Sequence, residues 1–386
     1  MPEPTESLAA QVARDYQDVA LVLQGGGALG AYQAGVVEAL AGAGVHPHWV
    51  AGISIGALNA AIIAGNPPER RVEQLHAFWD TICTPPPWLG VPVWFDASGL
   101  PAGMQGGLSS VAAWSAVVSG QKGFFRPRMP PPFLEPHATP NKASWYDTTP
   151  LRATLERLAD FDRINDPRQM HVSVGAVNVR TGNFVYFDNT KQQLRPEHFM
   201  ASGALPPGFA AVEIDGEYYW DGGMVSNTPL YRVLHDEPER DLLVFQVDLW
   251  SARGEVPHDL AGVADRGKEI QYSSRTRLIT DAMREARSRK RMLRDLMALV
   301  PPARREDPAF LAAAQESCSA QVNLIHLIYR DKPYEGHFKD YEFSAASMRA
   351  HWQAGMADMQ HTLDHPQWFA RPSVEQAFVT HDVHRG

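Results

Sequence analysis

Short apolar runs alternate with longer helical stretches along the first part of the chain. Residues 20–23 and 49–51 are continuous apolar runs, and 242–247 is apolar except for Gln246; all three predict strands buried on both faces of a sheet. The first two runs lead into stretches rich in small and apolar residues, 31–40 and 57–64, which predict helices. Strands that repeatedly lead into helices indicate a three-layer α/β fold, with a central, mostly parallel sheet and helices on both faces.

The pattern changes at about residue 265, where long charged sequence with helical periodicity begins. Its apolar positions recur at helical spacing: Ile279, Met283, Ala286, Leu293, Met297 and Val300. Between residues 275 and 295, eight Arg or Lys residues against three acids predict a strongly basic opposite face. This face is either solvated, or it binds anionic headgroups or an acidic protein partner. Farther on, residues 322–329 predict an edge strand, and Ser344 is a good N-cap for a helix to about residue 363.

Composition and charge narrow the classes of protein. The chain has 386 residues, of which 44% are hydrophobic, and a net charge of −9. This charge disfavours nucleic acid as a partner, because binding phosphates needs a basic face. Cys83 and Cys318 are too few for a disulfide framework, which favours a reducing, cytoplasmic location. The most apolar window, 49–65, is too short to span a bilayer, so we expect at most a peripheral attachment to membranes.

A serine lies in a glycine-flanked turn at the end of a predicted strand. The sequence Gly52-Ile53-Ser54-Ile55-Gly56 reproduces the G-x-S-x-G pattern between the apolar run and the helical stretch. Glycines two residues to either side remove Cβ atoms that would clash in so sharp a turn, and they expose the serine hydroxyl. Ser54 is therefore a candidate nucleophile. The pattern is weak by itself, because it recurs by chance in glycine-rich chains.

A glycine-rich loop follows the first predicted strand. Residues 25–30, with the sequence GGGALG, link this strand to a helix. Backbone N–H groups in such a loop point at one spot, with the positive end of the helix dipole behind them. They can therefore stabilise the oxyanion that develops when an acyl carbonyl is attacked. A side chain placed at Gly26 is expected to crowd that site.

The same loop also satisfies the dinucleotide-binding pattern G-x-G-x-x-G. That alternative requires an acidic residue about twenty positions later to bind a ribose, yet no Asp or Glu occurs between Glu38 and Glu69. A P-loop is disfavoured as well, because Ala31 and Tyr32 stand where Lys and Ser or Thr are needed.

A third motif is Tyr218-Tyr219-Trp220-Asp221-Gly222-Gly223, in which an aromatic strand delivers an acid into a glycine turn. Asp-Gly alone usually marks only a turn. Taken in order, the glycine loop, the G-x-S-x-G elbow and the late D-G-G strongly resemble the patatin-like phospholipase family over about residues 18–250. The segments 201–209 and 212–216 look like the part of the family that leads into its catalytic Asp. The resemblance implies Ser54 as nucleophile, Asp221 as general base, and the backbone amides of Gly25, Gly26 and Gly27 as oxyanion hole.

The resemblance also sets the expected domains and shows one departure. It implies a patatin-like catalytic domain over 19–255, preceded by a flexible arm at 1–18 and followed by a mainly helical region at 256–386. Within that region, 334–344 is similar to an uncharacterised extension carried by a subset of bacterial family members. Leu29 stands where the family commonly has Arg or Lys. Without that cation, a neutral acyl ester becomes the favoured substrate.

The proton of the serine hydroxyl needs an acceptor, and two arrangements stay open. In a Ser54–Asp221 dyad, burial must raise the basicity of the carboxylate, which predicts a neutral to alkaline pH optimum. In a Ser-Asp-His triad on an α/β-hydrolase fold, a late histidine such as His326 takes the proton. His326 lies in the strand-like 322–329, which favours packing or solvation over catalysis. The other histidines form no cluster of metal ligands, so no metal or other cofactor is expected.

Residues 83–145 interrupt the αβ alternation with proline triplets and glycines. The aromatic residues of this insertion are Trp88, Trp94, Phe95, Trp114, Phe124, Phe125, Phe133 and Trp145. It is either a packed subdomain that covers the sheet, or a lid that presents aromatic rings to lipid and walls an acyl pocket.

We therefore expect a serine acyl-ester hydrolase of lipids that works through an acyl-enzyme. The alternative is a catalytically weak family member that binds a membrane or a protein partner. A homo-oligomer or protein partner, if present, is expected to use the C-terminal region.

Overall fold

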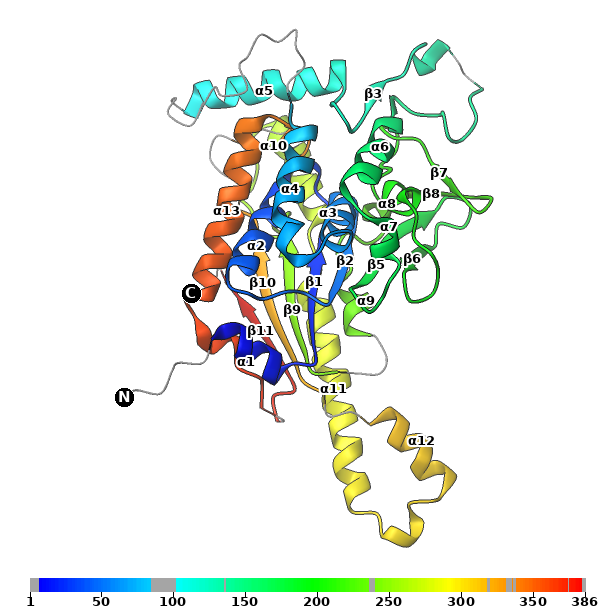
Figure 1. Cartoon of the computed structure of the whole chain (residues 1–386), viewed down its shortest axis with the longest axis vertical. Coiled ribbons are helices and arrows are strands. Elements are labelled where there is room, and N and C mark those ends of the chain that lie inside the picture. The colour runs from blue at the N-terminus through cyan, green and yellow to red at the C-terminus, as the bar shows by residue number, and fades with distance from the viewer. Residues whose placement is uncertain are drawn as a thin grey trace.

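The computed structural model describes residues 7–84, 102–134, 137–235, 240–317, 320–330, 335, 338–373 and 375–383. Its centre is a nine-stranded sheet in the order β11-β10-β9-β1-β2-β5-β8-β7, with β6 also paired to β5 (Figure 1). From β11 to β5, every neighbouring pair is parallel, whereas β6, β7 and β8 pair antiparallel. The three-layer α/β fold with a mostly parallel sheet is thus confirmed.

The strands coincide with the apolar runs because both of their faces are covered. On β1, Leu21 and Leu23 belong to the larger apolar core, and Ala20 and Val22 to a smaller core on the opposite face. The strands are β1 Asp18–Leu23, β2 Trp49–Gly52, β5 His171–Asn178, β6 Phe184–Asp188, β7 Val212–Ile214, β8 Glu217–Asp221, β9 Leu242–Asp248, β10 Val322–Ile328 and β11 Phe378–Asp382.

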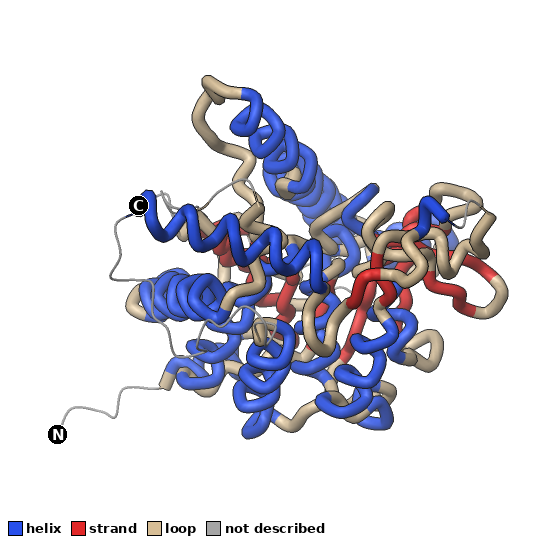
Figure 2. The backbone as a smooth tube through the Cα atoms, turned by 90° about the horizontal axis from the view of Figure 1, so that it is seen from above, coloured by secondary structure: helices blue, strands red, loops and turns tan. Residues whose placement is uncertain are grey.

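Helices cover both faces of the sheet (Figure 2). The larger core lies beneath α2 Ala31–Gly42, α3 Ile55–Ala64, α4 Pro68–Ile82, α6 Thr149–Leu158, α7 Phe161–Ile164, α8 Pro196–Ser202 and α13 Ala345–Leu363. The smaller core lies beneath α9 Leu230–Leu234 and the first half of α11 Thr276–Ala298. Helix α10 Leu260–Tyr272 precedes α11, and α12 Pro308–Glu316 packs against α11. Beyond the sheet, α11 and α12 project as a hairpin, at the end of the molecule opposite α5 Ala102–Ser119 (Figure 1).

The C-terminal region contributes two strands rather than one. Strand β10 corresponds to the expected edge strand, but it lies between β9 and β11, and β11 forms the edge. Helix α13 provides the crossover that a parallel neighbour requires. The expectation that residues 322–329 form the edge of the sheet was therefore wrong, because β11 lies outside them.

The N-terminal segment is ordered where it is described. Residues Leu8–Asp15 form helix α1, with Ser7 as N-cap. Val12 is buried in the larger core, and the Tyr16 hydroxyl donates a hydrogen bond to the carbonyl of Phe369 at 3.2 Å. The expectation of a flexible arm over residues 1–18 is therefore wrong for residues 7–18. Residues 1–6 lie outside the described part of the chain.

Helices α2 and α13 touch through two glycines. A Cβ atom at Gly35 would lie 2.0 Å from the carbonyl oxygen of Trp352, and one at Gly355 would lie 2.0 Å from that of Tyr32. Only glycines allow the two backbones to approach so closely. The C-terminal region is therefore packed directly onto α2, the helix that follows the glycine loop.

The aromatic insertion combines packed and exposed parts. Phe124 and Phe125 are buried, next to the short pair of β3 Arg126–Pro127 and β4 Tyr146–Asp147. Trp114 on α5 and Phe133 are exposed by 60% and 70%. Trp88, Trp94 and Phe95 lie outside the described residues.

Candidate active site

Ser54 lies in a strained turn at the carboxyl end of β2. Its backbone has φ 54° and ψ −125°, a conformation that non-glycine residues rarely adopt. A Cβ atom at Gly52 would lie 2.4 Å from the carbonyl oxygen of Gly56, so the turn requires the flanking glycine. The expected strand, elbow and helix are all present, and the turn directs the Ser54 side chain into a cavity.

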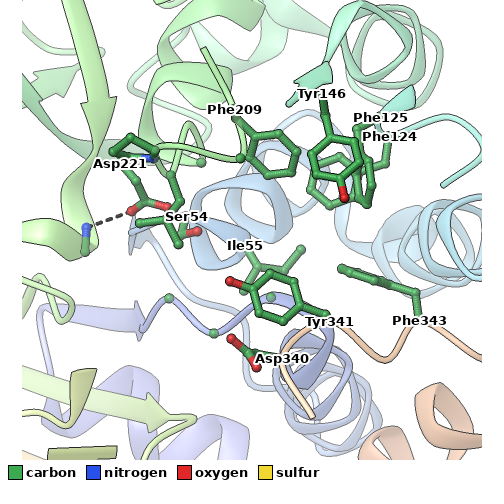
Figure 3. A pocket seen from close by; sticks show the side chains of 18 of the residues that line it. Ser54, Ile55, Phe124, Phe125, Tyr146, Phe209, Asp221, Asp340, Tyr341 and Phe343 are labelled. Carbon is green, nitrogen blue, oxygen red and sulfur yellow. Dashed lines mark hydrogen bonds between the residues drawn. The ribbon is translucent and has the colours of Figure 1, made fainter. Parts of the chain in front are cut away.

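Asp221 is brought next to Ser54 by β8. The Ser54 hydroxyl lies beside the Asp221 carboxylate, and the Gly223 N–H donates a hydrogen bond to this carboxylate at 2.7 Å. Figure 3 shows the two side chains together at one end of the cavity. Burial raises the pKa of Asp221 to about 7, although the nearby Ser54 hydroxyl and the Gly223 N–H both lower it. The carboxylate is therefore a stronger base than an exposed aspartate.

The glycine loop lies beside Ser54 and Asp221. Some of its backbone N–H groups already donate to carbonyl groups of the protein, and others do not. The Gly25 N–H donates to the carbonyl of Asn227 at 3.2 Å, and the Ala28 N–H donates to the carbonyl of Asp340 at 3.0 Å. Gly26 and Gly27 have no backbone acceptor for their N–H groups among the described residues. These two amides are therefore the ones available to a substrate.

A side chain at Gly26 would first meet residues other than Ser54. Its Cβ atom would lie 2.7 Å from Leu249 Cδ1 and 3.1 Å from Trp250 Nε1, so the expected direct crowding of the carbonyl site is replaced by a clash with these two side chains. At Gly25, by contrast, a Cβ atom would lie 3.0 Å from Ser54 Cβ. Sequence alone does not reveal this difference, because it depends on which way each Cα–Cβ bond points.

Residues outside the three motifs support Ser54 and the glycine loop. The Ser202 hydroxyl accepts a hydrogen bond from the Ser54 N–H at 3.0 Å and donates one to the carbonyl of Gly175 at 2.6 Å. The Asn227 side-chain amide donates to the carbonyl of Gly25 at 3.0 Å, and the Trp250 indole N–H does so at 2.9 Å. The only sign of Ser202 in the sequence was its place in the segment 201–209.

The cavity above Ser54 has a volume of about 370 Å³. Aromatic side chains from distant parts of the chain form much of its wall (Figure 3): Phe124, Phe125, Tyr146, Phe209, Tyr341 and Phe343. The ring centroids of Phe125 and Phe209 are 5.2 Å apart, and those of Phe124 and Phe343 are 5.7 Å apart. The buried Phe124 and Phe125 of the insertion thus form part of the cavity wall. Sequence reasoning missed that the C-terminal region also contributes, through Tyr341 and Phe343.

His326 does not line this cavity. Its Nε2 atom lies 2.6 Å from Asp248 and 3.3 Å from the Gln246 side chain, within a buried polar network. Leu29, at the position of the family's usual cation, is fully buried in the larger core. Among the described residues, no group of three or more His, Cys, Asp and Glu side chains is arranged to hold a metal ion. Within the same residues, no helix is both long and apolar enough to cross a bilayer.

Two solved structures are distantly similar to this chain. No curated protein sequence matches the chain. Among solved structures, VipD from Legionella pneumophila is 15% identical, with a TM-score of 0.36; the match covers 88% of this chain and 67% of VipD. Human GIVD cytosolic phospholipase A2, solved in complex with methyl gamma-linolenyl fluorophosphonate, is 12% identical, with a TM-score of 0.36. That match covers 94% of this chain but only 63% of the human chain, less than two thirds of its length.

Two family models match the sequence. One, described as a patatin phospholipase domain (DUF3734), matches residues 270–375 in the C-terminal region. The other, described as patatin-like phospholipase, matches residues 21–234, which is more than half of the chain and includes the glycine loop, Ser54 and Asp221. The chain therefore belongs to the patatin-like phospholipase family.

Proposed function

We propose that the protein is a serine hydrolase of lipid acyl esters that uses a Ser54–Asp221 dyad. The observation that carries this proposal is that the two side chains lie together at one end of an apolar cavity, with the Asp221 carboxylate buried. Ser54 Oγ attacks the acyl carbonyl while Asp221 accepts its proton, and the N–H groups of Gly26 and Gly27 stabilise the oxyanion. The proton then passes to the departing alcohol, which leaves an acyl-enzyme. Water attacks the acyl-enzyme through the same base, releasing the acid and restoring Ser54.

The cavity supports an uncharged ester at the reacting end of the substrate. Among the described residues that line it, none is Arg, Lys or His. A phosphate held inside would have to lose its hydration without gaining a cation, which is unfavourable. The aromatic walls instead suit an acyl chain, since burial of apolar surface favours its entry. We therefore propose an acyl ester whose headgroup, if charged, remains outside the cavity.

The proposal is tested by labelling with a fluorophosphonate probe and by hydrolysis of a soluble acyl ester. Wild-type protein should react with the probe at Ser54 and release the acid, whereas Ser54→Ala should do neither. His326→Ala should retain substantial activity, because His326 does not line the cavity. A loss in His326→Ala as deep as that in Ser54→Ala would favour a triad. Failure of wild-type protein to react at Ser54 would favour the catalytically weak binding protein.

A further inference from the structure

We propose that residues 338–343 of the C-terminal region determine substrate specificity in this active site. In this proposal, Tyr341 and Phe343 form the wall that limits the acyl chain, while Asp340 holds the glycine loop in position. The inference rests on the proposed hydrolase function and assigns a role to a segment outside the matched catalytic domain.

The main chain of this segment lies directly against the glycine loop. The carbonyl oxygen of Asp340 accepts the hydrogen bond from Ala28 N–H at 3.0 Å. Gly27 has φ +56°, and a Cβ atom there would lie 2.2 Å from the same oxygen. Any larger residue would separate the two segments. Since the Gly26 and Gly27 amides adjoin this contact, the position of Asp340 fixes the direction in which they point.

Two ion pairs anchor the segment to α10. Lys268 Nζ lies 3.0 Å from both carboxylate oxygens of Asp340 and 4.8 Å from the centre of the Tyr341 ring. In the second pair, the segment supplies the positive charge and α10 the negative one. Lys339 Nζ lies 2.9 Å from Glu269 Oε1, and the Lys339 side chain is only 2% exposed. Removing one partner of such a pair leaves a poorly solvated charge, so the pairs favour one position of the segment.

The side chains of the segment close the cavity. The Phe343 ring is 5% exposed and packs edge-on against Phe124, whereas Tyr341 faces the space between Ser54 and Phe343 (Figure 3). Truncating Phe343 would add volume to a wall of the cavity. One methylene in an apolar pocket typically changes discrimination by roughly tenfold or more, so the acyl preference should respond to this change.

The wall is tested with Phe343→Ala and a series of p-nitrophenyl esters of increasing acyl length. The ratio of kcat/KM for long acyl chains to that for short chains should rise by about tenfold or more. Phe369→Ala is the matched control, because this ring is also fully buried in the C-terminal region but does not line the cavity. If Phe343→Ala does not fold, Phe343→Leu makes the same comparison with less loss of packing. An unchanged ratio in a folded variant would overturn the assignment of the wall.

The anchor is tested with Lys268→Met, which removes the charge that pairs with Asp340. We expect kcat on a short soluble ester to fall by about tenfold or more, the direction seen when an oxyanion donor is displaced, with little change in KM. Lys268→Arg should recover most of kcat, and Arg284→Met, which breaks an exposed pair with Asp281, should have no effect. Wild-type kcat in Lys268→Met would overturn the positioning role. If wild-type protein shows Ser54-dependent hydrolysis while these variants match it, only the inference about the segment fails.

Discussion

Asp221 is the residue whose ionisation should control both activity and stability. Its pKa of about 7 follows from burial, and its nearest hydrogen-bond donors are uncharged. Burial raises the pKa values of Tyr272 and Tyr341, and the Asp221 charge adds to the effect, so both remain neutral at physiological pH. Burial also raises the pKa of Asp340 in the same cavity, but Asp221 is the carboxylate beside Ser54, and we expect its titration near pH 7 to control the reaction.

Activity should rise with pH as Asp221 loses its proton. If the carboxylate acts as the base, kcat/KM on a soluble ester should fall below pH 7 and level off above it. Replacing Asp221 with Asn should abolish nearly all turnover, because the amide cannot accept the proton. The check is a pH profile of kcat/KM; constant activity from about pH 5 to pH 9 would exclude Asp221 as the base.

Stability should change with pH in the opposite direction. The pKa of Asp221 is raised on folding from 3.8 to about 7, so its stabilising contribution is complete below pH 4 and is lost as pH rises through 7. Asp221→Asn avoids this loss and should be more stable than wild type above pH 7. The difference should reach roughly 4 kcal/mol, because each unit of pKa difference between the folded and unfolded states corresponds to about 1.4 kcal/mol. Urea unfolding at two pH values measures the difference. Equal stability at high pH would show that the carboxylate is better solvated than its burial implies.

Ser202 is expected to position the nucleophile without reacting. Ser202→Ala leaves the Ser54 N–H and the Gly175 carbonyl without their partner, which should cost about 1–3 kcal/mol of stability. We expect a lower kcat with preserved fluorophosphonate labelling at Ser54. Ser226→Ala provides a control, because that hydroxyl makes only a long 3.5 Å contact to Thr228. Loss of labelling in folded Ser202→Ala would instead make Ser202 part of the reacting group.

Among the elements, the packing of α2 on α13 should be the least tolerant of added volume. Gly355→Ala places a Cβ 2.0 Å from the Tyr32 carbonyl and should destabilise the protein by about 2–4 kcal/mol. Gly42→Ala, at the end of α2, meets no atom within 4 Å and should be neutral or stabilising by up to about 1 kcal/mol. Thermal unfolding compares the two. Similar melting temperatures would mean that the helices separate easily.

Two exposed tryptophans of the insertion, Trp114 and Trp145, lie beside the cavity. Trp145 is 49% exposed and lines the cavity, as do Ala116 and Val117 on α5, which also carries Trp114. If these rings enter a lipid surface, Trp114→Ala should reduce hydrolysis of esters in vesicles but spare a soluble ester. Equal losses on both substrates would assign Trp114 to packing.

Sequence reasoning succeeded for elements whose pattern is local. β1, β2 and β9 are apolar runs covered on both faces, and Ser54 and Asp221 lie in short motifs. It missed β11, because Phe378–Asp382 contains His and Asp and acquires its position only by pairing with β10. It also missed Asp340 and Phe343, since no local pattern shows that a late loop meets a glycine loop near the N-terminus.

On the scale of the whole molecule, residues 19–255 should not fold independently. Without the C-terminal region, β9 loses β10 as its neighbour, and α2 loses the cover of α13. An exposed edge strand and an uncovered apolar helix favour aggregation. We expect a chain ending at residue 255 to be insoluble or molten, as measured by circular dichroism and gel filtration. A cooperatively folded fragment would show that the C-terminal region is an independent addition.

The overall shape also separates two surfaces that the sequence indicated as candidates for binding lipid, the aromatic insertion and the basic helix α11. The exposed Trp114 of α5 lies at one end of the molecule, and the hairpin of α11 and α12, which includes the Arg-rich helix α11, projects at the other (Figure 1). One flat bilayer cannot contact both ends. If the cavity entrance faces the membrane, the basic hairpin faces away from it and remains accessible to a partner in solution.

The contact between Ala28 and Asp340 also bears on how the protein is made. Synthesis proceeds from the N-terminus, so Ser54, Asp221 and the glycine loop all leave the ribosome well before the residues that hold that loop in place. On the proposed mechanism, a nascent chain carries its nucleophile but not a finished oxyanion hole. The emerging protein should thus remain inactive toward nearby membranes until Asp340 has been synthesised and packed against the glycine loop, a delay that follows from the order of translation.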